Sequence, residues 1–266
     1  MSTTTESTTD PKAEPTVDTA TIASTQQAGR ARFFIQPLAC VLLVIGCFVF
    51  VQVANVSSTE ARSLSISNLL PLVRQHLQIS LIATAVTVVL AVPIGILLTR
   101  GKMRRFSKPI ITVAGFGQAA PAIGLIALGA AIFGIGSFGA IVALVIYGLL
   151  PIIANTVAGI DSVDSKLVEA GRGMGMSSFS TLVRVELPLA LPIIVAGVRT
   201  ALVLIVGTVS LVSFTGGGGL GELITSGIRL RQNVVLVIGA LLIAALALFI
   251  DWLARVVELA AAPKGV

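Results

Sequence analysis

The sequence predicts an all-α protein that crosses a membrane about six times. Of its 266 residues 55% are hydrophobic and only 11% are charged, whereas soluble domains carry about 25% charged residues. Several apolar runs reach about 18 residues or more with few charges, which is typical of membrane-spanning helices. So low a charge content excludes a water-facing surface around the whole chain, and we expect a polytopic protein in contact with the lipid bilayer.

The net charge of +6 does not indicate a nucleic-acid partner. The basic residues cluster beside the apolar runs, a pattern that orients spans in a membrane. Aromatic residues make up only 5% of the chain, so platforms on which bases stack are scarce. We therefore expect no nucleic-acid binding.

The N-terminal part divides into a tail, a span and a connector. Residues 1–29 are rich in Ser and Thr, lack apolar periodicity and are predicted to be a disordered cytoplasmic tail. The apolar run that follows is longer than the roughly 7–15 residues of a signal-peptide core, so residues 30–56 are predicted to be an uncleaved first span. Residues 57–75 are predicted to be a polar connector with room for a short interfacial helix.

The segment "RGKMRRFSK", residues 100–108, sets the orientation of the chain. It follows the second predicted span, His76–Thr99, and holds five basic residues and no acid. Short loops rich in Lys and Arg stay in the cytoplasm. The loop is therefore predicted to be cytoplasmic through Arg100, Lys102, Arg104, Arg105 and Lys108.

The remaining spans follow by alternation. The chain is predicted to cross outward, inward, outward and inward over the runs Pro109–Phe133, Phe138–Gly159, Pro188–Phe214 and Asn233–Arg255. The core is then residues 76–257 with a cytoplasmic loop at 160–188, and 258–266 is a cytoplasmic C-terminal tail. Both termini are expected in the cytoplasm.

Loop 160–188 has a pattern that predicts structure. Apolar residues at 179, 182, 183 and 187 form one stripe on a helix, with Ser177 or Ser178 as N-cap and Pro188 as its stop. Two short helices joined at Gly171–Gly175 are predicted. Such an amphipathic unit suits docking into a groove of another protein. The alternative is a helix on the lipid surface, which usually carries clustered Lys and Arg.

The same segment, "EAGRGMGMSSFSTLVRVELP", resembles the E-A-A-x3-G-x9-I-x-L-P motif of permease subunits of ATP-binding-cassette importers. Gly171 replaces the second Ala, Val185 replaces the Ile, and five positions match in register: Glu169, Ala170, Gly175, Leu187 and Pro188. The resemblance extends over roughly 75–257. Stretches such as "YGLLPIIANTVAGI" and "GGGGLGELI" look like the glycine betaine/carnitine/choline (osmoprotectant) subfamily.

The resemblance implies a type I importer permease in the cytoplasmic membrane that translocates a compatible solute by alternating access. It implies two permease subunits forming the pore (a homodimer or a heterodimer), two separate ATP-binding subunits and an extracytoplasmic substrate-binding protein. The seven motif positions would contact the ATPase. A permease for methionine, phosphonate or another small solute is an alternative, and an ATP-independent secondary transporter is a less favoured one.

The chain lacks the motifs of an ATPase or a hydrolase. No G-x-x-x-x-G-K-[ST] segment is present to hold ATP phosphates. His76 is the only histidine, and Cys40 and Cys47 lie in one apolar run, so neither a catalytic triad nor a zinc site is expected. We expect no enzyme activity and no cofactor in this chain, with ATP and Mg²⁺ bound by the partner ATPase.

Polar residues within the predicted spans are candidates for a translocation path. A charge inside a span is costly and usually functional, which favours Arg199, although pairing between helices is an equal alternative. Small hydroxyl residues also serve ordinary helix packing. The candidate path residues are Gln118, Asn155, Arg199, Thr208 and Ser210. Asp251 and Arg255, four residues apart, are predicted to form an ion pair.

The segment "TGGGGLGEL" matches the G-x-G-x-x-G spacing of dinucleotide-binding enzymes. That fingerprint must follow a strand and needs an acid about 20 residues later. Here a membrane span precedes it, and no acid occurs between Glu222 and Asp251. The predicted topology instead places the segment at the external mouth, and the resemblance implies that it borders the gate where the binding protein docks, with a contact-free flexible turn as the alternative. The gate residues are Gly216, Gly217, Gly218, Gly219 and Gly221.

Overall fold

The computed structural model describes residues 19–53 and 56–261. Their helices, in chain order, are α1 (Thr19–Val53), α2 (Ser58–Ser63), α3 (Ile66–Leu98), η1 (Gly101–Phe106), α4 (Ser107–Ala119), α5 (Ala122–Phe133), α6 (Ser137–Asp161), α7 (Ser165–Gly173), α8 (Ser178–Thr181), η2 (Leu182–Glu186), α9 (Leu187–Val209), η3 (Ser210–Thr215), α10 (Gly221–Leu230) and α11 (Asn233–Ala261). No strand occurs in these residues, so the predicted all-α class is confirmed.

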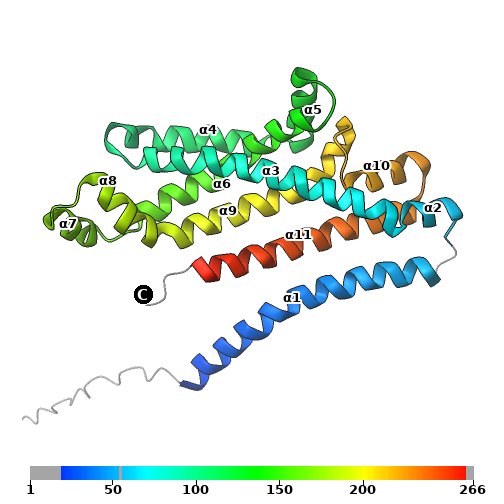
Figure 1. The fold of residues 1–266 in the computed structure, drawn as a ribbon, viewed down its shortest axis with the longest axis horizontal. Helices are drawn as coiled ribbons and strands as arrows, with labels where there is room; N and C mark the ends of the chain where they lie inside the picture. Colours follow the sequence, from blue (N-terminus) through cyan, green and yellow to red (C-terminus); the bar gives the residue numbers. More distant parts are fainter. Residues whose placement is uncertain (1–18, 54–55, 262–266) are drawn as a thin grey trace, which may run out of the picture.

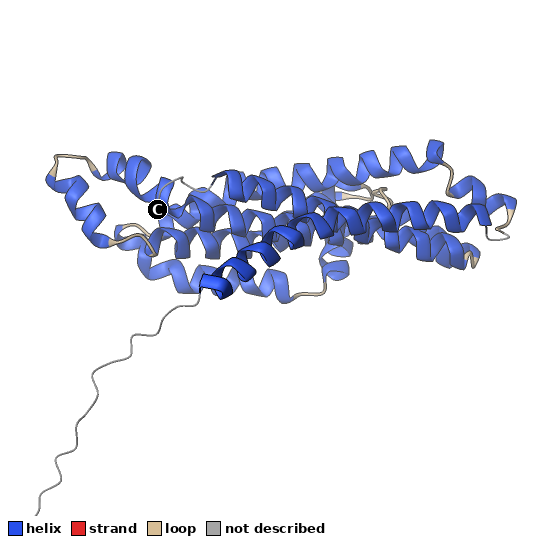
Figure 2. Cartoon of the chain, turned by 90° about the horizontal axis from the view of Figure 1, so that it is seen from below, coloured by secondary structure: helices blue, strands red, loops and turns tan. Residues whose placement is uncertain are grey.

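The long helices run along the long axis of the molecule (Figures 1 and 2). Within the described residues five helices are long and apolar enough to cross a membrane, and the bent pair formed by residues 101–119 and α5 makes a sixth if it counts as one span. The start of α1 and the end of α11 lie at the end that carries α7 and α8 (Figure 1). The order of the passes is the one that the sequence predicts.

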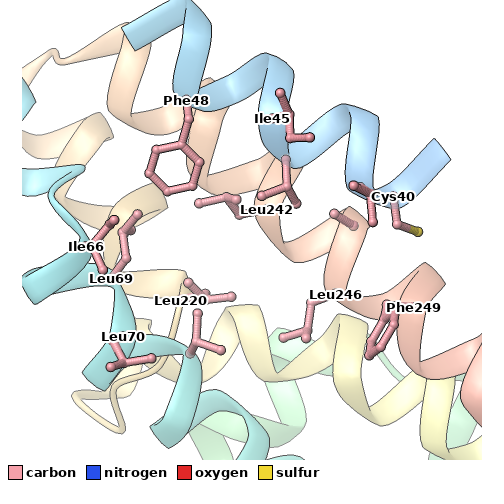
Figure 3. A pocket seen from close by; sticks show the side chains of 14 residues that line it. Cys40, Ile45, Phe48, Ile66, Leu69, Leu70, Leu220, Leu242, Leu246 and Phe249 are labelled. Carbon is pink, nitrogen blue, oxygen red and sulfur yellow. The ribbon is translucent and has the colours of Figure 1, made fainter. Parts of the chain in front are cut away.

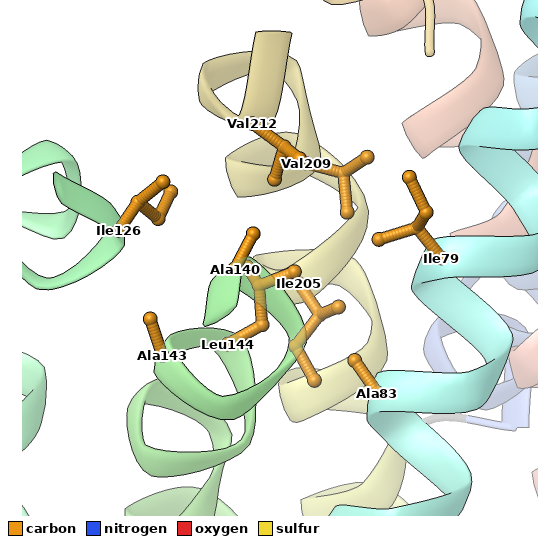
Figure 4. Packing of buried hydrophobic residues seen from close by; sticks show 9 residues of the cluster. All are labelled: Ile79, Ala83, Ile126, Ala140, Ala143, Leu144, Ile205, Val209 and Val212. Atoms are coloured by element: carbon orange, nitrogen blue, oxygen red, sulfur yellow. The ribbon is translucent and has the colours of Figure 1, made fainter. Parts of the chain in front are cut away.

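The main core lies where α3, α5, α6, α9 and η3 meet. Small residues let these helices approach closely, as the direct backbone contact between Gly129 of α5 and Gly139 of α6 shows. Branched aliphatic side chains fill the remaining space (Figure 4). This cluster consists of Ile79, Ala83, Ile126, Ala140, Ala143, Leu144, Ile205, Val209 and Val212.

Two predicted boundaries near the N-terminus are wrong. Helix α1 begins at Thr19, so residues 19–29 are helical, whereas residues 1–18 and 54–55 lie outside the described residues. The connector 57–75 is mostly helical too. Ser57 and Glu60 form a capping box that starts α2, and α3 begins at Ile66 because its apolar side chains, Leu69 among them, pack into a cluster with α1 and α11. Of the predicted C-terminal tail, 262–266 also lie outside the described residues.

The third predicted span is not one straight helix. α4 ends at Ala119, α5 starts at Ala122, and the two are bent by 92°. Pro121 has no N–H to continue the ladder, and it disfavours a helical conformation at Ala120, whose ψ is 143°. The proline therefore breaks this span.

Candidate functional site

Loop 160–188 forms a protruding unit at one end of the molecule, with α7 and α8 at its tip (Figure 1). Asp164 caps α7 by accepting from the Lys166 N–H at 2.9 Å, and Ser177 Oγ accepts from the Ser180 N–H at 3.2 Å. Gly175 takes a φ of +86° at the turn between the two helices. The two predicted helices and the Ser177 cap are therefore confirmed.

The prediction that Pro188 stops the second helix is wrong. The chain stays helical from Ser178 through η2 into α9, and Pro188 lies in the first turn of α9. A proline inside an α-helix clashes with the carbonyl four residues earlier and cannot donate to it. η2 is a π-helical segment in which the Leu187 N–H donates to the Leu182 carbonyl, and this wider turn accommodates the proline.

The loop that carries Glu169 exposes apolar side chains. Glu169, Ala170 and Gly175 are exposed, Val185, Leu187 and Pro188 lie nearer the membrane helices, and Gly171 is buried. An added methyl at Gly171 would only make ordinary contact with Met176, so Gly there is not required by packing. The exposed apolar side chains of the tip are Leu167, Met174, Phe179 and Val183.

The base of the loop is held by arginines of the basic segment 100–108. Arg100 donates through both terminal nitrogens to the carboxylate of Glu186, at 3.1 Å to Oε1 and in a second, shorter contact to Oε2. Glu186 is only 4% exposed, so this pair is buried on the carboxylate side. Arg104 reaches Asp161 at 3.2 Å, but both side chains are exposed. The sequence analysis had given neither pairing.

The glycine segment 216–221 lies at the opposite end of the molecule and is largely buried. Gly216, Gly218 and Gly219 have φ of +73°, +84° and +82°, which disfavour any residue with a Cβ. Gly217 would clash with Val212 and Gly221 with the Ser210 carbonyl if either carried a side chain. These contacts argue against a contact-free flexible turn.

Gln75 of α3 holds this segment, and the sequence analysis missed it. Its Nε2 donates to the Gly217 carbonyl at 3.1 Å, and its Oε1 accepts from the Gly219 N–H at 3.1 Å. The next residue, His76, is fully buried and donates from Nε2 to the Val206 carbonyl of α9 at 2.9 Å. The signal in the sequence was a Gln-His pair at the polar edge of an apolar run.

The charged candidate Arg199 belongs to a cluster between α9 and α11. It donates to Asp251 at 2.7 and 3.1 Å and to Glu258 at 3.1 Å. Gln36 of α1 also donates to Asp251, at 3.0 Å. The predicted Asp251–Arg255 ion pair is therefore wrong, because Arg199 on the facing helix offers the carboxylate a closer bidentate partner.

The opening at Arg199 does not include the other path candidates. Arg199 lines this opening of about 340 Å³ with Asp251 and Glu258. Asn155, Thr208 and Ser210 each donate to a carbonyl three or four residues earlier, at 2.7 Å. Gln118 lies just before the break between α4 and α5.

Comparison with known proteins identifies the family to which this chain belongs. The family model "Binding-protein-dependent transport system inner membrane component" matches residues 91–261. The chain belongs to this family. It thus is a multi-pass inner-membrane permease, and the resemblance given by the Glu169–Pro188 motif is confirmed.

Relatives of this permease agree with the assignment. It is 41% identical over 191 residues to the glycine betaine/carnitine/choline transport system permease protein OpuCB of Bacillus subtilis, covering 72% of this chain and 87% of the relative. It is 38% identical over 197 residues to the osmoprotectant import permease protein OsmW of Salmonella typhimurium, covering 72% and 91%. The fold matches the MetNI methionine ABC transporter in an inward-facing conformation, with a TM-score of 0.64 and 22% identity over 73% of this chain and 96% of that one.

The permease also has an apolar groove of about 420 Å³ between α1, α3 and α11 (Figure 3). Its lining includes Cys40, Phe48, Leu69 and Phe249 and no charged residue. A groove of this composition offers nothing to orient a polar solute, because solute sites need a few placed polar groups.

Proposed function

We propose that this permease translocates a compatible solute of the glycine betaine, carnitine or choline type by alternating access, driven by ATP hydrolysis in separate subunits. The named activities of relatives that are about 40% identical over most of their length support this substrate class. The chain itself has no phosphate-binding loop, so ATP and Mg²⁺ would be held by the partner ATPase and no cofactor by this chain.

The observation that carries the coupling role is the exposed apolar tip of loop 160–188. Leu167, Met174, Phe179 and Val183 are exposed and would be costly to leave in water, and they belong to the same loop as Glu169. Contiguous apolar surface rimmed by polar residues marks protein-interaction sites. The loop therefore suits a groove on an ATP-binding subunit, with two such subunits beneath two permease subunits.

The opposite end suits contact with a substrate-binding protein. The glycine segment 216–221 and the turn at 134–137 meet there, where Gly136 donates to the Thr215 carbonyl at 3.1 Å. With loop 160–188 in the cytoplasm, both termini are cytoplasmic and this segment faces outward as the gate. Recognition of a quaternary ammonium usually needs an aromatic cage. Tyr147 and Trp252 are the only aromatics besides Phe, so the binding protein would carry most of the selectivity.

Co-purification tests the proposal. A tagged permease expressed with its native partners should retain an ATP-binding subunit, and Glu169→Lys should reduce that retention and the transport of glycine betaine. Leu167 is exposed on the same loop, and Leu167→Asp should have the same effect as Glu169→Lys. Full assembly and transport in both variants would overturn the coupling role, and tight betaine binding by the isolated permease would overturn the assignment of selectivity to the binding protein.

A further inference from the structure

Two-point polar clamps lie at both ends of the stretch 75–100: Gln75 is inside α3, more than two turns after its start at Ile66, and Arg100 is just past its end at Leu98. At one end Gln75 binds the Gly217 carbonyl and the Gly219 N–H, each at 3.1 Å. At the other end Arg100, two residues past the last turn, binds both carboxylate oxygens of Glu186. The helix between them rises about 1.5 Å per residue, so the clamps are roughly 35 Å apart.

Both clamps close on the same neighbouring stretch of chain. Glu186 directly precedes α9, and α9 leads through η3 into the glycine segment 216–221. A third bond joins the two helices near the outer end, where His76 donates to the Val206 carbonyl at 2.9 Å. Polar bonds therefore connect α3 and the residue after it to α9 and its flanking segments at both ends of α9.

The space between the two helices is filled along their length. Ile79 and Ala83 of α3 share a buried cluster with Ile205 and Val209 of α9. Further toward the Arg100 end, Ala91 shares a second buried cluster with Ala201. Close-packed interiors switch between discrete arrangements and do not deform continuously, so the pair would move as one body.

We propose that Gln75 and Arg100 are positioning residues that make α3 and α9 one rigid frame, which carries a displacement of loop 160–188 to the glycine segment 216–221. This inference rests on the proposed function, because it needs an ATPase that moves the loop and a gate that responds. The bidentate clamps matter because they fix orientation as well as distance. Coupling between two sites in proteins is typically worth about 5- to 150-fold in an equilibrium.

The test uses the complete transporter, with ATPase and binding protein, in vesicles. Glycine betaine transported per ATP hydrolysed is measured for Gln75→Leu and Arg100→Lys. Arg100→Lys keeps a positive charge opposite Glu186 but lacks the planar guanidinium that donates two parallel hydrogen bonds. The variant therefore retains the buried ion pair and loses its fixed geometry. Each change should lower the transport-to-ATP ratio by between about 5- and 150-fold, with ATP hydrolysis continuing.

Two controls and a double variant make the test specific. Gln78→Leu, on an exposed position of the same helix, and Lys102→Gln, in the exposed basic segment, should keep the wild-type ratio. Because both clamps serve one frame, Gln75→Leu with Arg100→Lys together should lose no more than the worse single variant. Wild-type ratios in both singles, or losses that multiply in the double, would overturn the frame. A wild-type transporter without ATP-driven uptake would instead overturn the proposed function.

Discussion

Replacing Gly218 by alanine tests the packing of the glycine segment quantitatively. Two costs combine at this position. A residue with a Cβ in a left-handed conformation costs about 1–2 kcal/mol, and Gly218 has φ +84°. The added methyl would also collide with the Gln75 side chain and displace it. That displacement would break two hydrogen bonds, each worth about 0.5–1.5 kcal/mol. The sum is about 2–5 kcal/mol.

Two matched glycines separate these costs. Gly175 has φ +86° with no atom within 4 Å of an added Cβ, so Gly175→Ala should show the backbone cost alone. Gly173, the last residue of α7, has no positive φ and no atom within 4 Å of an added Cβ. Gly173→Ala should therefore be neutral or slightly stabilising. At about 2–4 °C per kcal/mol for a chain of this size, Gly218→Ala should lower the unfolding temperature by about 4–20 °C.

The assay is the temperature at which the detergent-solubilised permease loses its monodisperse elution peak. Gly218→Ala should lower this temperature most, Gly175→Ala less, and Gly173→Ala least. Adding Gln75→Ala to Gly218→Ala removes the collision, so the pair should lose less than the two single changes added together. Equal losses at Gly218 and Gly175 would refute the clamp and leave only the backbone cost.

Four further variants test the ion pairs. Arg100→Met should destabilise the permease by about 3 kcal/mol, since it leaves the buried Glu186 carboxylate unpaired, whereas Arg104→Met removes an exposed pair worth less than about 1 kcal/mol. Thermal elution profiles compare the two, and equal losses would contradict the difference in burial. Arg199→Met should cost about 1–3 kcal/mol, and adding Asp251→Leu should recover part of that loss in the same assay. No recovery would show that Asp251 does not depend on Arg199.

The sequence predicted the number and order of passes because each depends on local hydropathy. Apolar runs and the basic segment 100–108 sufficed to place them. Loop 160–188 was found by its fixed motif spacing, and the Ser177 cap by the chemistry of a single side chain. These features need only neighbours in the sequence.

Two failures involve partners distant in the sequence, and tertiary packing decided both. Asp251 had a local candidate in Arg255, but its partner Arg199 comes from a facing helix that hydropathy does not orient. Gln75 could not be linked to glycines more than 140 positions away. The third failure is local: a proline was expected to stop the helix at Pro188, but a π-helical turn at 182–186 accommodates it.

Uptake of radiolabelled glycine betaine into vesicles tests the central claim most directly. The vesicles are right-side-out: they hold the permease with its ATPase, ATP is trapped inside on the ATPase side, and the binding protein is in the medium. Uptake from the binding-protein side should require both ATP with Mg²⁺ and the binding protein. Equal uptake without ATP, driven by an ion gradient alone, would contradict the assignment to an ATP-driven importer.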